Sequence, residues 1–185
     1  MFFMKILSRN RMAAGKFLAL DLIEYEDNRG IVRKWESVSR TGCGGAVVII
    51  CRTVPSDEII LVKQFRPPAG NIMLEFPAGL VEENEDPAVA AVRELEEETG
   101  FKGIVKKILP PSYSSPGLTS EQVFWATMEA NDTPECERHT NFDESEDIET
   151  VTVKRTELFA YLEKAMTEGV LIDSKLFAYA AGLAD

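Results

Sequence analysis

The sequence predicts an α/β fold in which a mixed β-sheet packs against helices and an antiparallel pair of strands precedes it. Three observations lead to this prediction: two strand-length apolar runs between residues 45 and 66, an amphipathic helical pattern over residues 87–99, and two more such patterns after residue 155. Short apolar runs are typical of buried strands, whereas apolar residues three and four apart indicate a helix packed against a core. With 185 residues, of which 45% are hydrophobic and 28% charged, the chain can bury a full core.

The N-terminal part has the pattern of a β-hairpin. FLALDLIEY (17–25) and IVRKWESVS (31–39) have strand composition and flank the turn signal Asp27-Asn28-Arg29-Gly30. We therefore expect an N-terminal strand region over residues 1–42 and a main domain over residues 43–185.

Strands alternate with helices in the main domain. The expected strands are GAVVIIC (45–51), EIILVKQFR (58–66), GIVKKIL (103–109), EQVFWATME (121–129) and IETVTVKR (148–155). Residues 130–147 are acidic and show no periodicity, which predicts a mobile loop. Two amphipathic helices close the chain, one over 156–169 with Thr156 as its N-cap and one over 172–184.

The helix over residues 87–99 has clear signals at both ends. Asp86 and Pro87 are a typical start, because a carboxylate caps free amide groups and proline suits the first helical position. Gly100 is placed to end the helix. The apolar face consists of Ala88, Ala91, Val92 and Leu95. This face should pack on the sheet.

Three glutamates share another face of this helix. Glu94, Glu97 and Glu98 are three and four residues apart and lie beside the apolar face, at the border of the core. Like charges at this spacing repel, and Arg93 alone cannot neutralise three carboxylates. A hard divalent cation can, because Mg²⁺ takes oxygen ligands and shares its shell with waters and phosphates. We therefore expect a metal site here, rather than the solvated surface that a charge run usually indicates.

Residues 79–101 resemble the signature of a known family. The pattern is G-x5-E-x7-R-E-U-x-E-E-x-G-U, where U is a bulky apolar residue. The chain fills its nine fixed positions with Gly79, Glu85, Arg93, Glu94, Leu95, Glu97, Glu98, Gly100 and Phe101. This pattern is similar to the box of the Nudix hydrolases. The resemblance implies an α/β/α sandwich that cleaves a nucleoside diphosphate linked to another group, with Mg²⁺ or Mn²⁺ as cofactor.

Further strings resemble one branch of that family, the ADP-ribose and ADP-sugar pyrophosphatases. In chain order they are GKF (15–17), WESV (35–38), LVKQFRPP (61–68), LEFPAGL (74–80) and SSPGLTSE (114–121). The resemblance implies cleavage between the two phosphates, giving AMP and a sugar phosphate, in a homodimer whose chains share each site. An isolated hairpin is marginal in water, which also favours a partner for the N-terminal strands.

The resemblance assigns roles to individual residues of the box. The implied metal ligands are Glu94, Glu97, Glu98 and the backbone carbonyl of Ala78. Arg93 would hold the box together by pairing with Glu85 or Glu97, so that Arg93 and Glu97 both belong to the catalytic set.

The same resemblance assigns substrate contacts. The implied residues are Phe17, Trp35, Glu36, Arg40, Arg66 and Ser115. Phe17 and Trp35 stand where the branch stacks the adenine. Glu36 and Arg40 are placed to contact ribose or phosphate, and Arg66 is the main phosphate candidate. Ser115 stands where some relatives carry an aspartate, so of these six residues it has the least support as a contact of the terminal ribose.

The catalytic base would come from the acidic stretch before the last strand, where the branch carries it in a mobile loop. NFDESEDIE offers Glu144, Glu146 and Glu149. The position of the following strand favours Glu146 and leaves the other two as alternatives.

Charge and composition exclude several classes of partner. With 31 acids, 20 bases and a net charge of −11, the chain is a poor candidate for non-specific nucleic-acid binding. Three cysteines lack metal-ligand spacing and suit a reduced cytoplasmic protein, and no apolar run approaches transmembrane length. We expect a small-molecule nucleotide-sugar substrate and neither a nucleic-acid nor a membrane partner.

Two other functions are compatible with the sequence. Phe17 and Ser115 leave room for a nucleoside-diphosphate sugar other than ADP-ribose. A non-catalytic nucleotide-binding module of the same fold is a different class, but such a module has no need of three metal-binding carboxylates.

Overall fold

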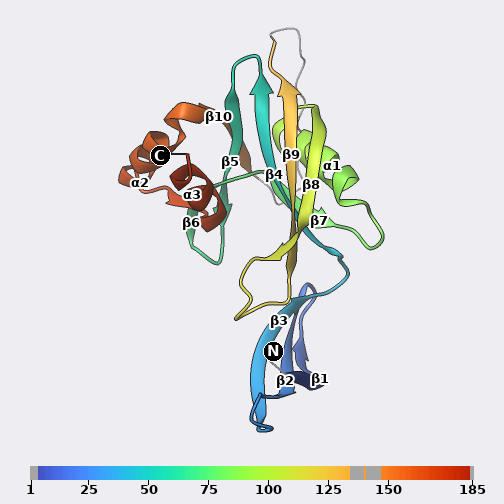
Figure 1. Ribbon diagram of the computed structural model, residues 1–185. Coiled ribbons are helices and arrows are strands. Elements are labelled where there is room, and N and C mark those ends of the chain that lie inside the picture. The colour runs from blue at the N-terminus through green and yellow to red at the C-terminus, as the bar shows by residue number, and fades with distance from the viewer. Residues whose placement is uncertain (1–3, 134–139, 141–146, 184–185) are drawn as a thin grey trace. The chain divides into compact units, whose positions relative to one another are not determined.

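The computed structural model describes residues 4–133, 140 and 147–183 (Figure 1). Its internal contacts divide the chain into two compact units. The first unit contains residues 1–46, 80–85 and 111–123, and the second contains 47–79, 86–110 and 124–185. Among the described residues, no helix combines the length and the apolarity needed to cross a membrane.

The first unit is built on a three-stranded antiparallel sheet with the order β1–β2–β3. Its strands are β1 (Lys5–Ala14), β2 (Leu18–Glu26) and β3 (Val32–Arg40). The turn between β2 and β3 is fixed by Asp27, whose Oδ1 accepts hydrogen bonds from the amides of Arg29 (2.9 Å) and Ile31 (3.0 Å). Gly30 in this turn has a φ of 76°, a left-handed conformation that favours glycine. The predicted hairpin is therefore confirmed.

Strand β1 extends the hairpin and lies outside the sequence prediction. Nine of its ten residues are exposed, so it shows none of the apolar alternation that marks a half-buried strand. Backbone pairing with β2 holds it, from Lys5 opposite Glu26 to Ala14 opposite Ala19. Such pairing leaves no side-chain signal in the sequence.

One buried carboxylate links all three strands of this sheet. Asp21 on β2 accepts a hydrogen bond from the Ser39 hydroxyl on β3 (2.8 Å) and one from Arg11 Nε on β1 (3.1 Å). Arg9 Nη1 lies 4.0 Å from the same carboxylate. The bond from Ser39, and after it the bond from Arg11, holds the pKa of Asp21 below its ordinary value, so the carboxylate remains charged.

A mixed eight-stranded sheet carries most of the second unit. Six strands have the order β11–β6–β5–β4–β9–β8, while β10 pairs with β5 and β7 with β4. The bounds are β4 (Gly45–Val54), β5 (Glu58–Arg66), β6 (Asn71–Glu75), β7 (Ala78–Val81), β8 (Gly103–Tyr113), β9 (Gln122–Asn131), β10 (Ile148–Lys154) and β11 (Leu171–Ile172). β11 runs parallel to β6 and β10 antiparallel to β5, which makes the sheet mixed, as predicted.

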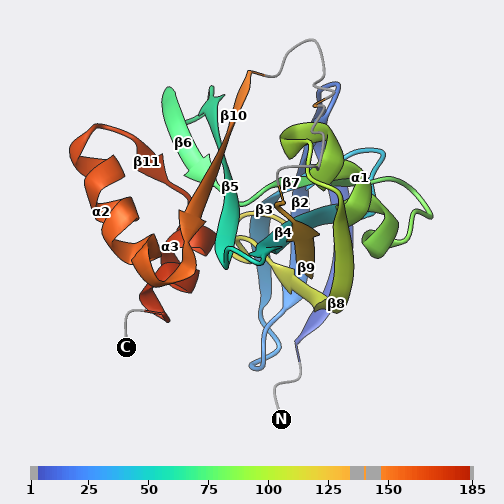
Figure 2. The same ribbon diagram turned by 90° about the horizontal axis from the view of Figure 1, so that it is seen from above.

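Helices cover this sheet on both sides. α1 (Pro87–Thr99) lies on one side, and α2 (Leu158–Thr167) and α3 (Ser174–Ala181) lie on the other (Figure 1, Figure 2). Buried apolar side chains of β4 and β5 fill the space between these layers, together with Leu95 of α1 and Leu162 of α2. Cys51 of β4 belongs to this core, where burial raises the pKa of its thiol to about 12. The arrangement confirms the predicted α/β class.

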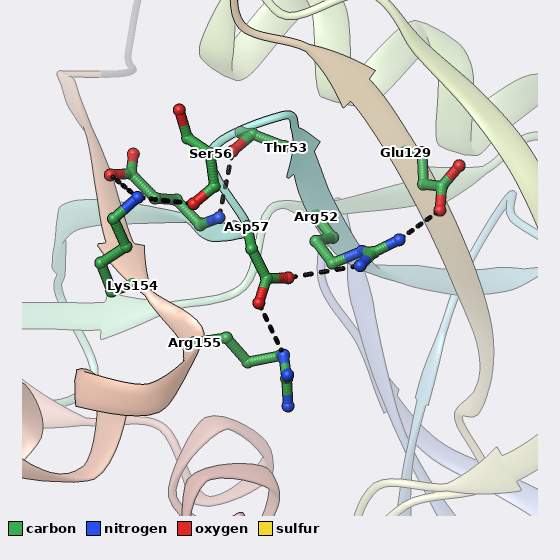
Figure 3. Close-up of polar contacts among 8 residues, drawn as sticks. Arg52, Thr53, Ser56, Asp57, Glu129, Lys154 and Arg155 are labelled. Atoms are coloured by element: carbon green, nitrogen blue, oxygen red, sulfur yellow. Dashed lines mark hydrogen bonds and ion pairs between the residues drawn. The ribbon is translucent and has the colours of Figure 1, made fainter.

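A group of ion pairs surrounds the β4–β5 turn and includes Arg155, just before α2 (Figure 3). Asp57 in this turn binds Arg52 of β4 and Arg155, which follows β10, each at 3.3 Å. Arg52 also pairs with Glu129 of β9 at 2.6 Å. Residues Arg155–Glu157 form a 3₁₀ turn, and the α-helix starts only at Leu158. The prediction of Thr156 as the N-cap is wrong, because Thr156 lies inside this 3₁₀ turn and Glu157 is the N-cap of α2.

Candidate active site

Helix α1 is capped at both ends as the sequence predicts. The Asp86 side chain accepts a hydrogen bond from the amide of Ala88 at 2.8 Å. Gly100 has a φ of 70°, and its amide donates to the carbonyl of Glu96 at 2.9 Å. The caps fix the first and last turns of α1. The place of a residue in the helix sequence therefore determines the direction in which its side chain projects.

The carboxylate of Glu94 lies directly over Gly79. A Cβ atom at position 79 would meet Cδ of Glu94 at 1.9 Å, Oε1 at 2.0 Å and Oε2 at 2.3 Å. The backbone conformation of Gly79 does not itself require glycine, because no left-handed φ occurs there. The glycine at the start of the box is therefore explained by the space that Glu94 occupies.

Glu98 approaches the residue next to Gly79. Its side chain is buried, and Oε2 accepts a hydrogen bond from the amide of Ala78 at 3.1 Å. Thr150 of β10 donates through Oγ1 to the Glu98 carbonyl at 3.3 Å, which holds this end of α1 against the sheet. Two carboxylates of α1 thus meet the same two-residue segment, Ala78–Gly79.

Arg93 connects Glu94 with Glu97. Its Nη1 lies 2.7 Å from Oε1 of Glu94 and 3.2 Å from Oε2 of Glu97. Glu85, the other partner considered from the sequence, accepts a hydrogen bond from the amide of Glu82 at 2.9 Å. An arginine that bridges two glutamates reduces the repulsion between them, and so helps to hold both in place.

The donor set of this helix suits a divalent cation. Glu94 and Glu98 present carboxylate oxygens around the Ala78–Gly79 backbone, and hard cations such as Mg²⁺ prefer such ligands. Glu97 is turned towards Arg93. In the part of the chain that the structure describes, no three His, Cys, Asp or Glu side chains are grouped so that they could hold a metal ion. The residues thus fit a cation that also takes ligands from water or substrate.

Arg66 is held by a neighbouring carboxylate. Its Nε and Nη2 atoms donate to the two oxygens of Glu75, at 2.6 and 3.1 Å. Glu75 is buried near the end of β6, three residues before Ala78. A two-point contact fixes the plane of the guanidinium group. Arg66 therefore has a defined orientation in the unit that also contains Gly79 and helix α1.

Of the three candidate bases, only Glu149 lies among the residues that the structure describes. Glu144 and Glu146 lie outside the described residues. Glu149 lies opposite Lys63 in the β10–β5 ladder, and its Oε1 is 3.4 Å from Lys63 Nζ. The next residue, Thr150, contacts Glu98, and successive side chains of a strand point to opposite faces. Glu149 therefore points away from the helix face that carries Glu98.

In the first unit, residues 114–121 run along β3 and bring two candidate substrate contacts together. The Trp35 indole nitrogen donates to the carbonyl of Gly117 at 3.0 Å. Arg40 Nε forms an ion pair with Glu121. The indole of Trp35 is about half exposed and is available for stacking.

The remaining candidate contacts of this unit are exposed. The Lys16 ammonium lies over the ring of Phe17, 4.9 Å from the ring centroid. Glu36 lies on β3 opposite Leu22. The Ser115 carbonyl accepts from the amides of Leu118 and Thr119, both at 2.9 Å, so it closes a turn. Among the described residues, no side-chain hydrogen bond or ion pair joins Phe17, Glu36 or Ser115 to Trp35, whose indole bonds to Gly117.

Two acids that bind candidate arginines, one in each unit, lie outside the set that the sequence analysis names. Glu75 and Glu121 both occur in strings that carry the family resemblance, LEFPAGL and SSPGLTSE. Each binds an arginine that the sequence does identify, Arg66 or Arg40. Glu75 is 9 residues from Arg66 in the sequence and Glu121 is 81 residues from Arg40, so no local spacing identifies either carboxylate as the partner of its arginine.

Comparisons with known proteins agree with this geometry. The family model of the NUDIX domain matches residues 44–170. The chain is 34% identical over 188 residues to the ADP-sugar pyrophosphatase of Mus musculus, covering 96% of this chain and 86% of the relative. It is 33% identical over 178 residues to the ADP-ribose pyrophosphatase of Saccharomyces cerevisiae, covering 91% and 77%. A crystal structure of an ADP compounds hydrolase matches its fold, with a TM-score of 0.63, 21% identity and coverage of 86% and 83%.

The contact between Gly79 and Glu94 can be tested by adding a single methyl group. Gly79→Ala would displace the Glu94 carboxylate, which is the end of a flexible side chain, so the protein should still fold. We expect Mn²⁺ affinity to fall by about tenfold or more, since groups that orient metal ligands have effects of that size. Titration of free Mn²⁺ by electron paramagnetic resonance measures this.

Gly182→Ala is the matched control, because the nearest atoms to its Cβ lie 3.6 Å away. We expect it to bind Mn²⁺ as the wild type does. Wild-type affinity in a folded Gly79→Ala variant would contradict the role given to Glu94.

Proposed function

Because the chain belongs to the Nudix family, we propose that it hydrolyses the pyrophosphate bond of ADP-ribose or a related ADP-sugar and releases AMP and a sugar phosphate. The observation that carries this proposal is the meeting of Glu94 and Glu98 at the Ala78–Gly79 segment, in a chain that fills every position of the box. The names of two similar proteins, ADP-sugar pyrophosphatase and ADP-ribose pyrophosphatase, support the substrate class.

The residues of the second unit would work on the phosphates. Glu94, Glu97, Glu98 and the carbonyl of Ala78 would hold Mg²⁺ or Mn²⁺. When bound, such a cation neutralises phosphate oxygens in the transition state and lowers the pKa of a bound water. Arg93 keeps Glu94 and Glu97 in place by its two contacts.

Arg66 would contact a phosphate oxygen of the substrate. Glu75 fixes the plane of its guanidinium before substrate arrives, so little ordering is left for the moment of binding. Because Glu75 is buried, the pair is shielded from solvent on the carboxylate side, and its contact is stronger than that of a surface pair.

The residues of the first unit would bind the nucleoside. Trp35 offers a half-exposed indole on which the adenine can stack, and Phe17 is the second aromatic candidate. Glu36 and Arg40 are proposed to contact ribose or phosphate. Ser115 is proposed to lie near the terminal ribose, since its exposed hydroxyl can donate and accept.

A homodimer is proposed as the active assembly. Large apolar side chains of the three-stranded sheet and its connections are exposed: Met4, Ile6, Leu7, Met12, Phe17, Leu18, Ile31, Val32 and Trp35. Exposed apolar surface on this scale is typical of an interaction site, and closed two-fold dimers are the commonest assembly. Sedimentation velocity at micromolar concentration should give about twice the chain mass of 20.6 kDa. A fully active monomer would contradict the proposal.

The proposed function is tested by substrate turnover. With Mg²⁺, we expect ADP-ribose to be converted into AMP and ribose 5-phosphate, and chelation by EDTA to stop the reaction. Glu98→Gln removes one charge near Ala78 and should lower kcat on the order of a hundredfold, comparable with other losses of transition-state electrostatics. Glu96→Gln is the control, because the Glu96 side chain is about half exposed and pairs with Lys102 at 3.4 Å.

The products also separate the alternatives. Faster turnover of a different nucleoside-diphosphate sugar would change the substrate and keep the chemistry. Binding of ADP-ribose without turnover of any substrate in the panel would favour a non-catalytic nucleotide-binding module.

Glu146 is proposed as the catalytic base. Glu149 is engaged by Lys63, which leaves Glu146 and Glu144 as the acids to compare. Glu146→Gln should lower kcat strongly with little change in KM, because proton transfer matters mainly in the transition state. Glu144→Gln should have a much smaller effect. The reverse order of the two variants, measured at the same Mg²⁺ concentration, would assign the base to Glu144.

A further inference from the structure

Residues 114–121 of the first unit are attached to the edge of β3 by backbone pairing. The Val38 amide donates to the Leu118 carbonyl at 2.8 Å, and the Ser120 amide donates to the Val38 carbonyl at 3.3 Å. Val38 and Thr119 form a parallel bridge. β2 occupies the other edge of β3. The segment therefore continues the sheet for a short distance and follows β3 closely.

Residues 114–121 determine how the side chains of Trp35 and Arg40 lie relative to each other. They are five residues apart on β3, and side chains alternate between the faces of a strand, so β3 alone directs them to opposite faces. Both side chains nevertheless bind the segment, Trp35 through the Gly117 carbonyl and Arg40 through the Glu121 carboxylate. The position of one relative to the other is thus set by residues 114–121.

Glu121 is the charged anchor of the segment. One of its oxygens pairs with Arg40 Nε, and the other accepts a hydrogen bond from the Ser114 hydroxyl at 3.2 Å. Its amide donates to Thr119 Oγ1 at 3.1 Å. The Glu121 side chain is 17% exposed, whereas that of Arg40 is 42% exposed. The carboxylate thus ties both ends of the segment together while the guanidinium stays accessible.

We propose that Glu121 is a positioning residue for nucleotide recognition. It orients Arg40 and holds the 114–121 segment, and through Gly117 it fixes the indole of Trp35. The inference rests on the proposed function, because Trp35 and Arg40 act on an ADP-containing substrate only there. Glu121 needs no contact with the substrate, and its effect should pass through Arg40 and Trp35.

The ligand-free part of the test uses fluorescence. The chain has two tryptophans, so Trp125→Phe, once shown to retain wild-type activity, leaves Trp35 as the only indole reporter. In this background, Glu121→Gln should increase quenching of Trp35 by acrylamide, because the segment that carries Gly117 is less firmly held. Unchanged quenching would overturn the link between Glu121 and Trp35.

The second part is a double-mutant cycle between Glu121 and Arg40. Glu121→Gln should raise KM for ADP-ribose by about tenfold and change kcat by less than about threefold, since a charge-assisted contact used in binding is lost. In the Arg40→Ala background, Glu121→Gln should weaken binding by clearly less than the tenfold expected in the wild type, because only the route through Gly117 and Trp35 remains. Additive effects would overturn the positioning role.

Glu24→Gln is the matched control. Glu24 lies in the same sheet and has the same kinds of partner, Lys34 at 3.5 Å and the Ser8 hydroxyl at 3.2 Å. It should leave KM, kcat and quenching unchanged. Binding of ADP-ribose in EDTA, followed by Trp35 fluorescence, separates two kinds of failure. A wild type that binds ADP-ribose but does not turn it over with Mg²⁺ overturns the proposed hydrolysis and still tests Glu121, whereas a wild type that neither binds nor hydrolyses ADP-ribose overturns both.

Discussion

The candidate site depends on the contact between helix α1 and the Ala78–Gly79 backbone. Glu94 fills the space above Gly79, and Glu98 accepts the Ala78 amide, so two carboxylates of one helix are fixed by a segment that carries no charge. The capped ends of α1 and the packing of Leu95 in the core hold the helix in the register that this contact requires. Loss of that register would separate the two carboxylates from the segment, whatever their spacing on the helix.

A second constraint is common to three candidate arginines of the two units. Arg93, Arg66 and Arg40 each bind a carboxylate of their own unit. In a chain with 31 acids and 20 bases, an unpaired arginine would be attracted by many acids and would have no single orientation. The contacts with neighbouring carboxylates give each of these guanidinium groups a defined orientation.

The sequence predicts those elements that are fixed by neighbouring residues, and it does not predict those that depend on tertiary contacts. Asp86, Pro87 and Gly100 act through neighbouring backbone groups, so the limits of α1 follow from local chemistry, and the Asp27–Gly30 turn is predictable for the same reason. The strand β1 is held by backbone pairing and by Asp21, neither of which leaves a pattern in its own residues. The acid partners Glu75 and Glu121 depend on tertiary contacts, which no local spacing announces.

The alternation on β10 has a consequence for how this region can change in length. Thr150 binds the carbonyl of Glu98 on one face, while Glu149 pairs with Lys63 on the other. A residue inserted within β10 would exchange the two faces and break both contacts. Changes in length before residue 147 leave this ladder intact, because its pairing begins at Ile148. Homologous chains can therefore differ in length before β10 while the strand keeps the same neighbours.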